Sequence, residues 1–201
     1  MAPTYDIRWR FYLEDTLDRA ARYVETEGPA RVLDVGCGTG EFIRRLLFKL
    51  PEATFVGVDP AFGMVTQAQR KFPSNTSEVQ FLRAPAEQLP FRDGIFDWVT
   101  CCSCLHCLPE PQAALREMTR VLKFQGRILV MDWCRDSYLC RVANLWCRWF
   151  DPTHVWMYTV PEIRRMLEES GVNVTHVDRF RVPWPGRLKL WEMMLGLGVK
   201  R

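Results

Sequence analysis

The sequence predicts an α/β fold of the doubly wound type, in which a parallel sheet carries helices on both faces. Three observations lead to this prediction: a buried strand that runs into a glycine-rich turn, a second buried strand that ends in a carboxylate, and an alternation of strand and helix patterns. The length of 201 residues suits one domain with a single large core. We expect a ligand site beyond the carboxyl ends of the strands.

The first strand and its turn read Val-Leu-Asp-Val-Gly-Cys-Gly-Thr-Gly over residues 32–40. Glycine removes Cβ where a ligand approaches the backbone, and amides at the start of the next helix face that ligand. The spacing departs from G-x-G-x-x-G, because Glu41 stands where the third small residue belongs. Asp34, two residues before Gly36, would repel a pyrophosphate and attract a cation. The turn therefore favours a cationic nucleotide-type ligand, with a different nucleotide or no ligand as the alternatives.

A second strand supports this interpretation. Helical spacing of Phe42, Leu46, Leu47 and Leu50 precedes the apolar run at 54–59, which ends at Asp59. Asp59 lies 23 residues after Gly36. An acidic side chain about 20 residues beyond such a turn is positioned to accept both ribose hydroxyls of a nucleoside. An exposed aspartate at a strand end is the alternative.

Three more segments complete a family pattern. Residues 79–91 are expected to form a strand and a polar loop that contains Ala-Glu-Gln-Leu-Pro-Phe. Residues 96–108 are expected to form a fourth strand and the loop after it. Residues 114–130 are expected to form a helix that ends at Lys123 and a fifth strand that begins at Gly126. With the turn at 32–40, which resembles motif I (D-x-G-x-G-x-G), these segments resemble the class I S-adenosylmethionine (SAM) methyltransferases of the ubiquinone and menaquinone biosynthesis type. The resemblance covers residues 31–133 with high specificity.

The resemblance implies a Rossmann-like sheet of seven strands, mostly parallel, whose last strand is antiparallel. It implies SAM as the cofactor and a small-molecule methyl acceptor, with no metal. The residues expected to contact SAM are Asp34, Gly36, Cys37, Gly38, Gly40, Asp59, Pro60, Met64, Ala86, Glu87 and Cys102. Ala86 and Glu87 would line the adenine.

The two ends of the chain are expected to complete one domain. Helical spacing predicts an amphipathic helix that ends at Gly28-Pro29; its apolar positions are Leu13, Leu17, Ala20, Ala21 and Val24. With the resemblance, this implies that residues 1–28 form a cap, 31–133 the cofactor half, and 134–201 an acceptor cover with the terminal strands. Tyr5, Trp9 and Tyr12 either contact the cofactor or simply pack.

The C-terminal third is expected to hold one helix and two strands. The helix runs from Thr159 to Ser170, with Thr159 as N-cap, Glu162 at the capping-box position and Gly171 as C-cap. The strands are 172–182 and 188–199, separated by Pro-Trp-Pro-Gly at 183–186.

Aromatic residues gather between the fifth strand and this helix. Seven of the 26 residues at 133–158 are aromatic. They predict either a wall for an apolar or planar acceptor, such as a quinol or a phenol, or a satellite core under a long loop. His106 and His154 are the candidate general bases, because imidazole titrates near neutral pH. A loop histidine bonded to backbone is the alternative for His106.

The eight cysteines are expected to be free, since the chain shows no secretory signal and is expected to be cytoplasmic. Cys37, Cys134, Cys140 and Cys147 are predicted to be backbone or packing positions. The cluster of Cys101, Cys102, Cys104 and Cys107 with His106 lacks a second pair at zinc-site spacing, so packing is the main prediction. Arsenite methylation on these thiols is kept as an alternative.

The charge pattern limits the partners. The net charge is +3, and residues 134–201 hold 11 basic and 7 acidic side chains. A dedicated nucleic-acid protein is not expected, while an anionic acceptor, peripheral membrane contact and solvated helix faces all fit the basic C-terminal third. The sequence contains no run of about 18 apolar residues, so no membrane span is predicted. The alternatives to a small-molecule methyltransferase are an RNA or protein methyltransferase and a non-catalytic SAM-binding interaction protein. The sequence leaves the oligomeric state open.

Overall fold

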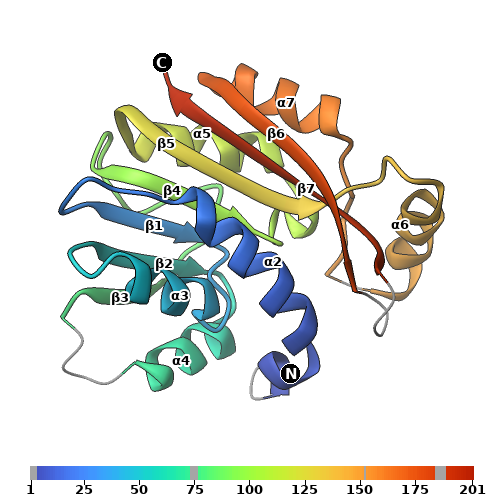
Figure 1. Ribbon diagram of the computed structural model, residues 1–201, viewed down its shortest axis with the longest axis horizontal. Helices are drawn as coiled ribbons and strands as arrows, with labels where there is room; N and C mark the ends of the chain where they lie inside the picture. The colour runs from blue at the N-terminus through green and yellow to red at the C-terminus, as the bar shows by residue number, and fades with distance from the viewer. Residues whose placement is uncertain (1–3, 73–76, 152, 184–188) are drawn as a thin grey trace.

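A computed structural model describes residues 4–72, 77–151, 153–183 and 189–201 (Figure 1). The strands are β1 (Arg31–Val35), β2 (Thr54–Asp59), β3 (Val79–Arg83), β4 (Phe96–Cys102), β5 (Leu122–Trp133), β6 (Val172–Pro183) and β7 (Lys189–Lys200). The helices are α1 (Tyr5–Arg8), α2 (Arg10–Tyr23), α3 (Glu41–Lys49), α4 (Phe62–Lys71), the 3₁₀ turn η2 (Leu105–Cys107), α5 (Pro111–Val121), α6 (Tyr138–Phe150) and α7 (Val160–Glu169).

The seven described strands form one sheet in the order β3-β2-β1-β4-β5-β7-β6. β1, β2, β3, β4 and β5 pair in parallel, and β7 runs antiparallel between β5 and β6. The predicted doubly wound, mostly parallel sheet is therefore confirmed, as is the antiparallel last strand. The strand order reverses between β1 and β4, and in open α/β sheets ligands bind outside the carboxyl ends of the strands at such a switch point.

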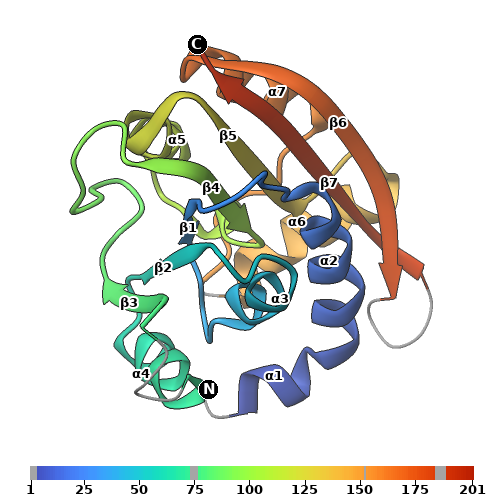
Figure 2. The same cartoon turned by 60° about the vertical axis from the view of Figure 1, so that its left-hand side comes forward.

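Helices cover both faces of the sheet because successive strand residues point to opposite sides. Val32 belongs to the buried cluster that includes residues of α2, α3 and α4, whereas its neighbour Leu33 belongs to the cluster that includes residues of α5 and α7. Figure 2 shows α2 beside α3, and the ion pair of Arg45 with Asp18 at 2.7 Å joins these two helices. α6 belongs to neither layer and stands at the side of the molecule (Figure 1).

The N-terminal helix differs from its prediction. It is broken at Trp9 into α1 and α2, and α2 ends at Tyr23, well before Gly28. Val24 is fully buried but already extended, so its burial comes from the connection to β1 and not from a helical face. No described helix is long and apolar enough to cross a membrane.

The C-terminal elements follow their predictions, with small shifts of boundary. Thr159 and Glu162 form the reciprocal capping box of α7, whose C-cap is Ser170, and Gly171 follows in a left-handed conformation at φ +89°. Lys123 lies in β5 instead of the preceding helix, because α5 ends at Val121. The predicted break is at 183–186 and the predicted second strand at 188–199. Residues 184–188, which include most of the break and the first residue of that strand, lie outside the described part of the chain.

Loss of the capping box should destabilise the fold measurably. Replacing Thr159 by Ala removes the hydroxyl that accepts the Glu162 amide, so we expect the free energy of unfolding to fall by about 1 kcal/mol. Thr66→Ala is the control, because that hydroxyl bonds the Phe62 carbonyl inside α4 and caps no helix. Urea denaturation followed by circular dichroism measures both. Equal stabilities of the two variants would contradict the role assigned to Thr159.

Candidate functional site

The glycine turn is bound to the end of β2. The amides of Gly36 and Cys37 both donate to the Val58 carbonyl, at 2.8 and 3.0 Å, and the amide of Gly38 donates to Oδ2 of Asp59 at 3.0 Å. These three amides lie in the turn, before α3 begins at Glu41, so the expectation that amides at the start of the helix face a ligand stays a prediction. The three turn amides hold the turn in a fixed shape against the neighbouring strand.

The three glycines of the turn answer to different constraints, although all have φ between +53° and +78°. A Cβ on Gly36 would meet the Cys104 sulfur at 2.2 Å, and one on Gly40 would meet the Phe81 ring at 2.9 Å. Protein packing therefore excludes a side chain at both positions. A Cβ on Gly38 would meet nothing within 4 Å, so open space lies in front of the middle glycine. This is the place where a ligand can approach the backbone.

Asp59 stands beside this opening. Its side chain is buried, and its oxygens accept the amides of Ala61 at 2.8 Å and Gly38 at 3.0 Å. Burial raises the pKa of Asp59, while these two hydrogen bonds act in the opposite direction. Each carboxylate oxygen can accept a second hydrogen bond, so Asp59 retains the capacity for a pair of ribose hydroxyls.

Asp34 of β1 lies deeper, and its side chain bonds the neighbouring strand β4. Its Oδ1 accepts the Thr100 hydroxyl at 2.8 Å, and only 2% of the residue is exposed. Burial raises the pKa of Asp34 to about 7, the Thr100 hydrogen bond opposes the shift, and the like charge of Asp59 adds to it. A cation placed between the opening at Gly38 and these two carboxylates would stabilise both ionised forms.

The residues at this edge fit a cationic nucleoside such as SAM. The opening at Gly38 accommodates close approach, Asp59 supplies hydrogen-bond acceptors, and two desolvated carboxylates supply negative charge. The other predicted contacts come from three neighbouring elements. Pro60 and Met64 follow β2, buried Ala86 and half-buried Glu87 lie in the loop after β3, and half-buried Cys102 ends β4.

The N-terminal segment lies over the glycine turn. Asp6 of α1 accepts the Thr39 hydroxyl at 2.5 Å and pairs with Lys71 of α4, which also pairs with Glu41 at 2.8 Å. Burial raises the pKa of Tyr5 to about 12, and the charges of Cys107, Asp6 and Asp59 add to the shift. Tyr5 and Trp9 pack against the buried cluster that contains Tyr12, as the packing alternative expects, and contact of Tyr5 with the cofactor stays a prediction.

A buried carboxylate–imidazole pair, Asp132 with His106, lies near the ends of β4 and β5. Nδ1 of His106 lies 2.6 Å from Oδ1 of Asp132, and Oδ2 of Asp132 accepts the His106 amide at 3.0 Å. Burial lowers the pKa of His106, but the charge of Asp132 and its hydrogen bond outweigh burial and raise that pKa well above the ordinary value. His106 is thus held in one orientation by a fully buried carboxylate, as an oriented base requires.

The loop that carries His106 is adjacent to the glycine turn. Cys104, two residues before it, is the side chain that packs directly on Gly36. His106 also stacks on Trp133, with ring centroids 4.1 Å apart and planes at 9°. The Trp133 indole donates to the Tyr12 hydroxyl at 2.8 Å, and Tyr12 bonds Ser103 at 2.7 Å. This network ties α2 to the loop that carries His106.

His154 is brought to the same place from the loop after α6. Its ring lies 5.7 Å from the His106 ring and 5.8 Å from Trp133, and Nε2 bonds Oδ1 of Asn144 at 3.0 Å. Burial lowers the pKa of His154 to about 4, and the nearby positive charge of His106 adds to this effect. His154 is therefore neutral at pH 7 and is a much weaker base than His106.

The cysteines separate into two groups. Cys134, Cys140 and Cys147 are buried, as predicted for packing positions, and all eight thiols are free. Burial raises the pKa of Cys37 and Cys102, so these thiols are protonated at neutral pH. Within the described ranges, the His, Cys, Asp and Glu side chains form no group arranged to hold a metal ion.

Several residues at the site were not identified from the sequence. Asp132 follows an apolar run, the same signal that identified Asp59, and could have been found in that way. Ser103, at φ +56°, and Asn144, which bonds His154 and the Met157 amide, carry no local signal. The aromatic stretch divides: Trp133 lines the site, while other members on α6 face outward, so neither predicted role describes them.

The unusual position of Asp34 predicts a pH-dependent stability. Its folded pKa of about 7 exceeds the unfolded value of 3.8, so its favourable contribution is complete below pH 4 and is lost as pH rises through 7. Asp34→Asn removes this loss and should raise the free energy of unfolding by about 2 to 4 kcal/mol at pH 8, with little change at pH 4.

Asp97→Asn is the matched control of opposite sign. Its hydrogen bond to Lys123 lowers the pKa of Asp97 despite some burial, so its contribution is present above pH 4 and is lost on acidification. Urea denaturation at pH 4, 6 and 8 measures both variants. A stability gain for Asp34→Asn that does not change with pH would contradict the assigned ionisation.

Comparisons with known proteins agree with this geometry. Residues 33–130 match the family model described as a methyltransferase domain. The chain is 33% identical over 207 aligned positions to the demethylmenaquinone methyltransferase of Deinococcus radiodurans, covering 100% of this chain and 82% of that protein. It is 38% identical over 127 positions to the enzyme of the same name from Thermus thermophilus, covering 63% of this chain and 54% of that protein.

The solved structure of the YcgJ protein from Bacillus subtilis has the same fold. Its TM-score is 0.79 at 24% identity, over 94% of this chain and 99% of that chain. The chain spans 54%, 63% and 60% of the length of three of the curated relatives it matches. By its sequence relatives and its sheet, the chain belongs to the class I SAM-dependent methyltransferases, in the group that resembles the ubiquinone and menaquinone biosynthesis enzymes.

Proposed function

We propose that this protein transfers the methyl group of SAM to a small aromatic or lipophilic acceptor, with His106 as the general base. The observation that carries the proposal is the His106–Asp132 pair, at 2.6 Å, on a loop that packs against the glycine turn through Cys104. A base oriented by a buried carboxylate beside the cofactor turn suits an acceptor that must lose a proton.

The cofactor half of the proposal assigns SAM to the opening at Gly38. SAM supplies a methyl group on a positively charged sulfur. Asp59 would accept the ribose hydroxyls, Asp34 would act through its charge, and Ala86 and Glu87 would line the adenine. The remaining proposed contacts are Gly36, Cys37, Gly40, Pro60, Met64 and Cys102. In this arrangement residues 1–28 form a cap, 31–133 the cofactor half and 134–201 the acceptor cover of one domain.

The acceptor half follows from the geometry of the imidazole. Because Nδ1 of His106 is engaged with Asp132, Nε2 is the atom that would take a proton from the acceptor. It can do so only above the raised pKa of His106, where the ring is neutral, so methyl transfer is expected to be fastest at alkaline pH. The negative charge of Asp132 stabilises the imidazolium formed in this step. Alignment of the acceptor with the methyl group supplies the rest of the rate, so the protein needs no nucleophile of its own.

The chemistry of the wall favours a planar acceptor. Trp133 and His154 present aromatic rings around His106, and Tyr12 and Ser103 supply hydroxyl groups at the same place. Flat apolar surfaces with a few polar groups suit a quinol or a phenol. Two relatives are named demethylmenaquinone methyltransferases, which agrees with an acceptor of this class.

Cofactor binding tests the first half of the proposal. Isothermal titration with SAM should show micromolar binding to the wild type and at least a tenfold loss in Asp59→Ala, because this carboxylate both holds the turn and faces the ribose. Asp97→Ala, at the opposite end of β4, is the control and should bind as the wild type does. Absence of binding by the wild type would refute the proposed cofactor site.

The pH dependence of turnover tests the second half. With labelled SAM and a short-chain 1,4-naphthoquinol, His106→Gln should lower kcat about 100-fold or more while SAM binding is retained. Asp132→Asn removes the charge that raises the pKa of His106, so the acid limb of the kcat/KM profile should move to lower pH as the maximal rate falls. An unmoved acid limb would exclude His106 as the titrating base. A parallel assay with arsenite tests the alternative acceptor.

A further inference from the structure

The outward face of α6 carries an apolar surface with no partner among the described residues. Tyr138 is 82% exposed, Trp149 is 86% exposed and Trp146 is 58% exposed. Four further apolar side chains of this helix are exposed: Leu139, Val142, Leu145 and Phe150. Monomeric proteins rarely expose such a contiguous patch unless it meets a partner or a membrane.

The helix has three distinct faces. At 100° per residue, Tyr138, Val142, Leu145, Trp146 and Trp149 share one side, which is the centre of the exposed surface. Cys140, Asn144 and Cys147 share the opposite side and are buried against the body of the protein. Arg141 and Arg148 lie together along one border of the apolar side. α6 contains no acidic residue.

The buried side fixes α6 firmly to the fold. The Cys140 sulfur accepts the Glu192 amide of β7, and Asn144 accepts from the Met157 amide at 2.8 Å and bonds His154. The Ser137 hydroxyl caps the N-terminus by accepting the Cys140 amide. The outward aromatic residues are therefore presented by a rigid, capped helix, and Trp146 stacks on Phe150 with centroids 4.7 Å apart.

We propose that α6 is an interfacial helix that docks the protein on an anionic lipid bilayer. Tryptophan and tyrosine are favoured at the boundary between headgroups and acyl chains, and leucine, valine and phenylalanine supply the apolar area that enters it. The thirteen residues of α6 are too few to span a bilayer, for which about 20 are needed, so the helix lies in the plane of the surface.

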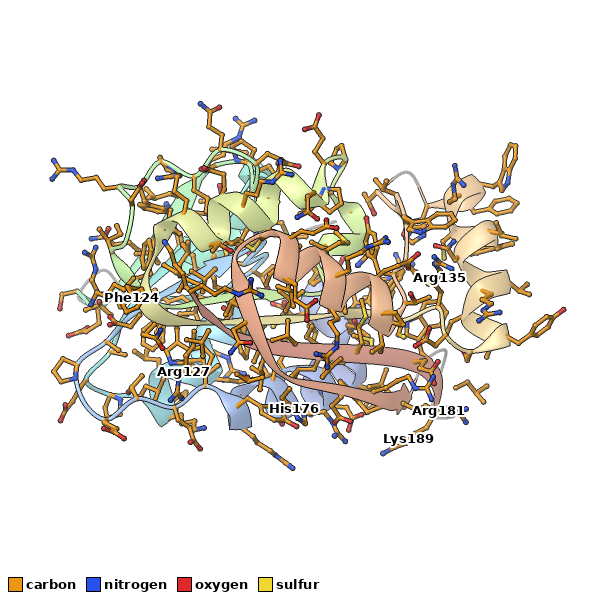
Figure 3. The ribbon with its side chains drawn as sticks, turned by 90° about the horizontal axis from the view of Figure 1, so that it is seen from above. Phe124, Arg127, Arg135, His176, Arg181 and Lys189 are labelled. Carbon is orange, nitrogen blue, oxygen red and sulfur yellow. The ribbon has the colours of Figure 1, made fainter. Side chains whose placement is uncertain are left out.

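Charge complementarity selects the anionic bilayer. Arg141 and Arg148 are exposed beside the apolar face, and Arg181 and Lys189 lie at the same end of the molecule as α6 (Figure 3). Arg135 also lies at this end but is paired with Glu162. Basic side chains next to an inserted apolar face add attraction to acidic headgroups. Asp136 and Asp151 flank the helix but are engaged locally, Asp136 with Arg179 and Asp151 with Thr153.

The docked helix would also bring the bilayer close to the acceptor site, a step that rests on the proposed methyl transfer. Asn144 on the inner side of α6 bonds His154, whose ring lies 5.7 Å from that of His106. A bilayer under α6 would thus stand beside the rings that surround the proposed base.

Vesicle flotation of the full chain, without SAM or acceptor, tests the docking by itself. Binding to vesicles of phosphatidylcholine and phosphatidylglycerol should exceed binding to phosphatidylcholine alone, and Trp146→Ser/Trp149→Ser should lower the partition coefficient about tenfold or more. Arg141→Gln/Arg148→Gln should remove the preference for anionic vesicles. Phe124→Ser is the matched control, because Phe124 is 76% exposed at the opposite end of the molecule (Figure 3) and should leave binding unchanged.

Three results would overturn the proposal. They are failure of the wild type to float with anionic vesicles, equal flotation of the double tryptophan variant, and a dimer seen by light scattering that the same variant dissociates, which would mean that a second copy covers α6. Circular dichroism of each variant verifies its fold. Failure of SAM binding or turnover would refute the proposed function and leave the flotation result intact.

Discussion

The burial of three carboxylates at one edge of the sheet is the constraint on which the site depends. Asp34, Asp59 and Asp132 stand near the carboxyl ends of β1, β2 and β5, and each is at most 8% exposed. A carboxylate removed from water must be hydrogen-bonded or paired. Asp34 is satisfied by a hydroxyl, Asp59 by backbone amides and Asp132 by the imidazole and amide of His106.

These partners divide the edge into two chemical halves. On the β2 side, the carboxylates of Asp34 and Asp59 act on each other with like charge, so the site attracts a cation. On the β5 side, Asp132 is neutralised by His106 and raises the basicity of that ring. Cys104 packs on Gly36 and joins the halves at contact distance. A positively charged methyl donor and an acceptor that loses a proton suit this division.

The two sides of α6 differ in what they contact. The inner side of α6 holds His154 in place through Asn144, and its outer side exposes aromatic and apolar residues to the surroundings. A helix that only completed a core would place these side chains inward, since each buried large apolar side chain contributes roughly 1.5 to 3 kcal/mol. The outward placement of Trp146 and Trp149 therefore indicates an interaction that the isolated chain does not contain.

Local patterns were sufficient to predict the sheet and the edge of it at which Gly38 and Asp59 meet. Alternating strand and helix signals, the glycine turn at 36–40 and the strand-end Asp59 are properties of short segments, so they predicted the doubly wound fold and the edge that carries the site. The capping box of α7 was predicted for the same reason, because its two hydrogen bonds join residues three apart.

Tertiary contacts decided the remainder. The turn amides donate to Val58 and Asp59, and the pairing of β1 with β2 brings these acceptors to them. The Asp132 partner of His106 is 26 residues away and meets it only because β4 and β5 are neighbours in the sheet. The aromatic residues of α6 have helical periodicity in any case, but which side is buried depends on where β7 lies. The sequence determined the strands, the glycine turn and the polar residues that follow the apolar runs, because these are local patterns. Packing of distant segments determined which of those residues meet.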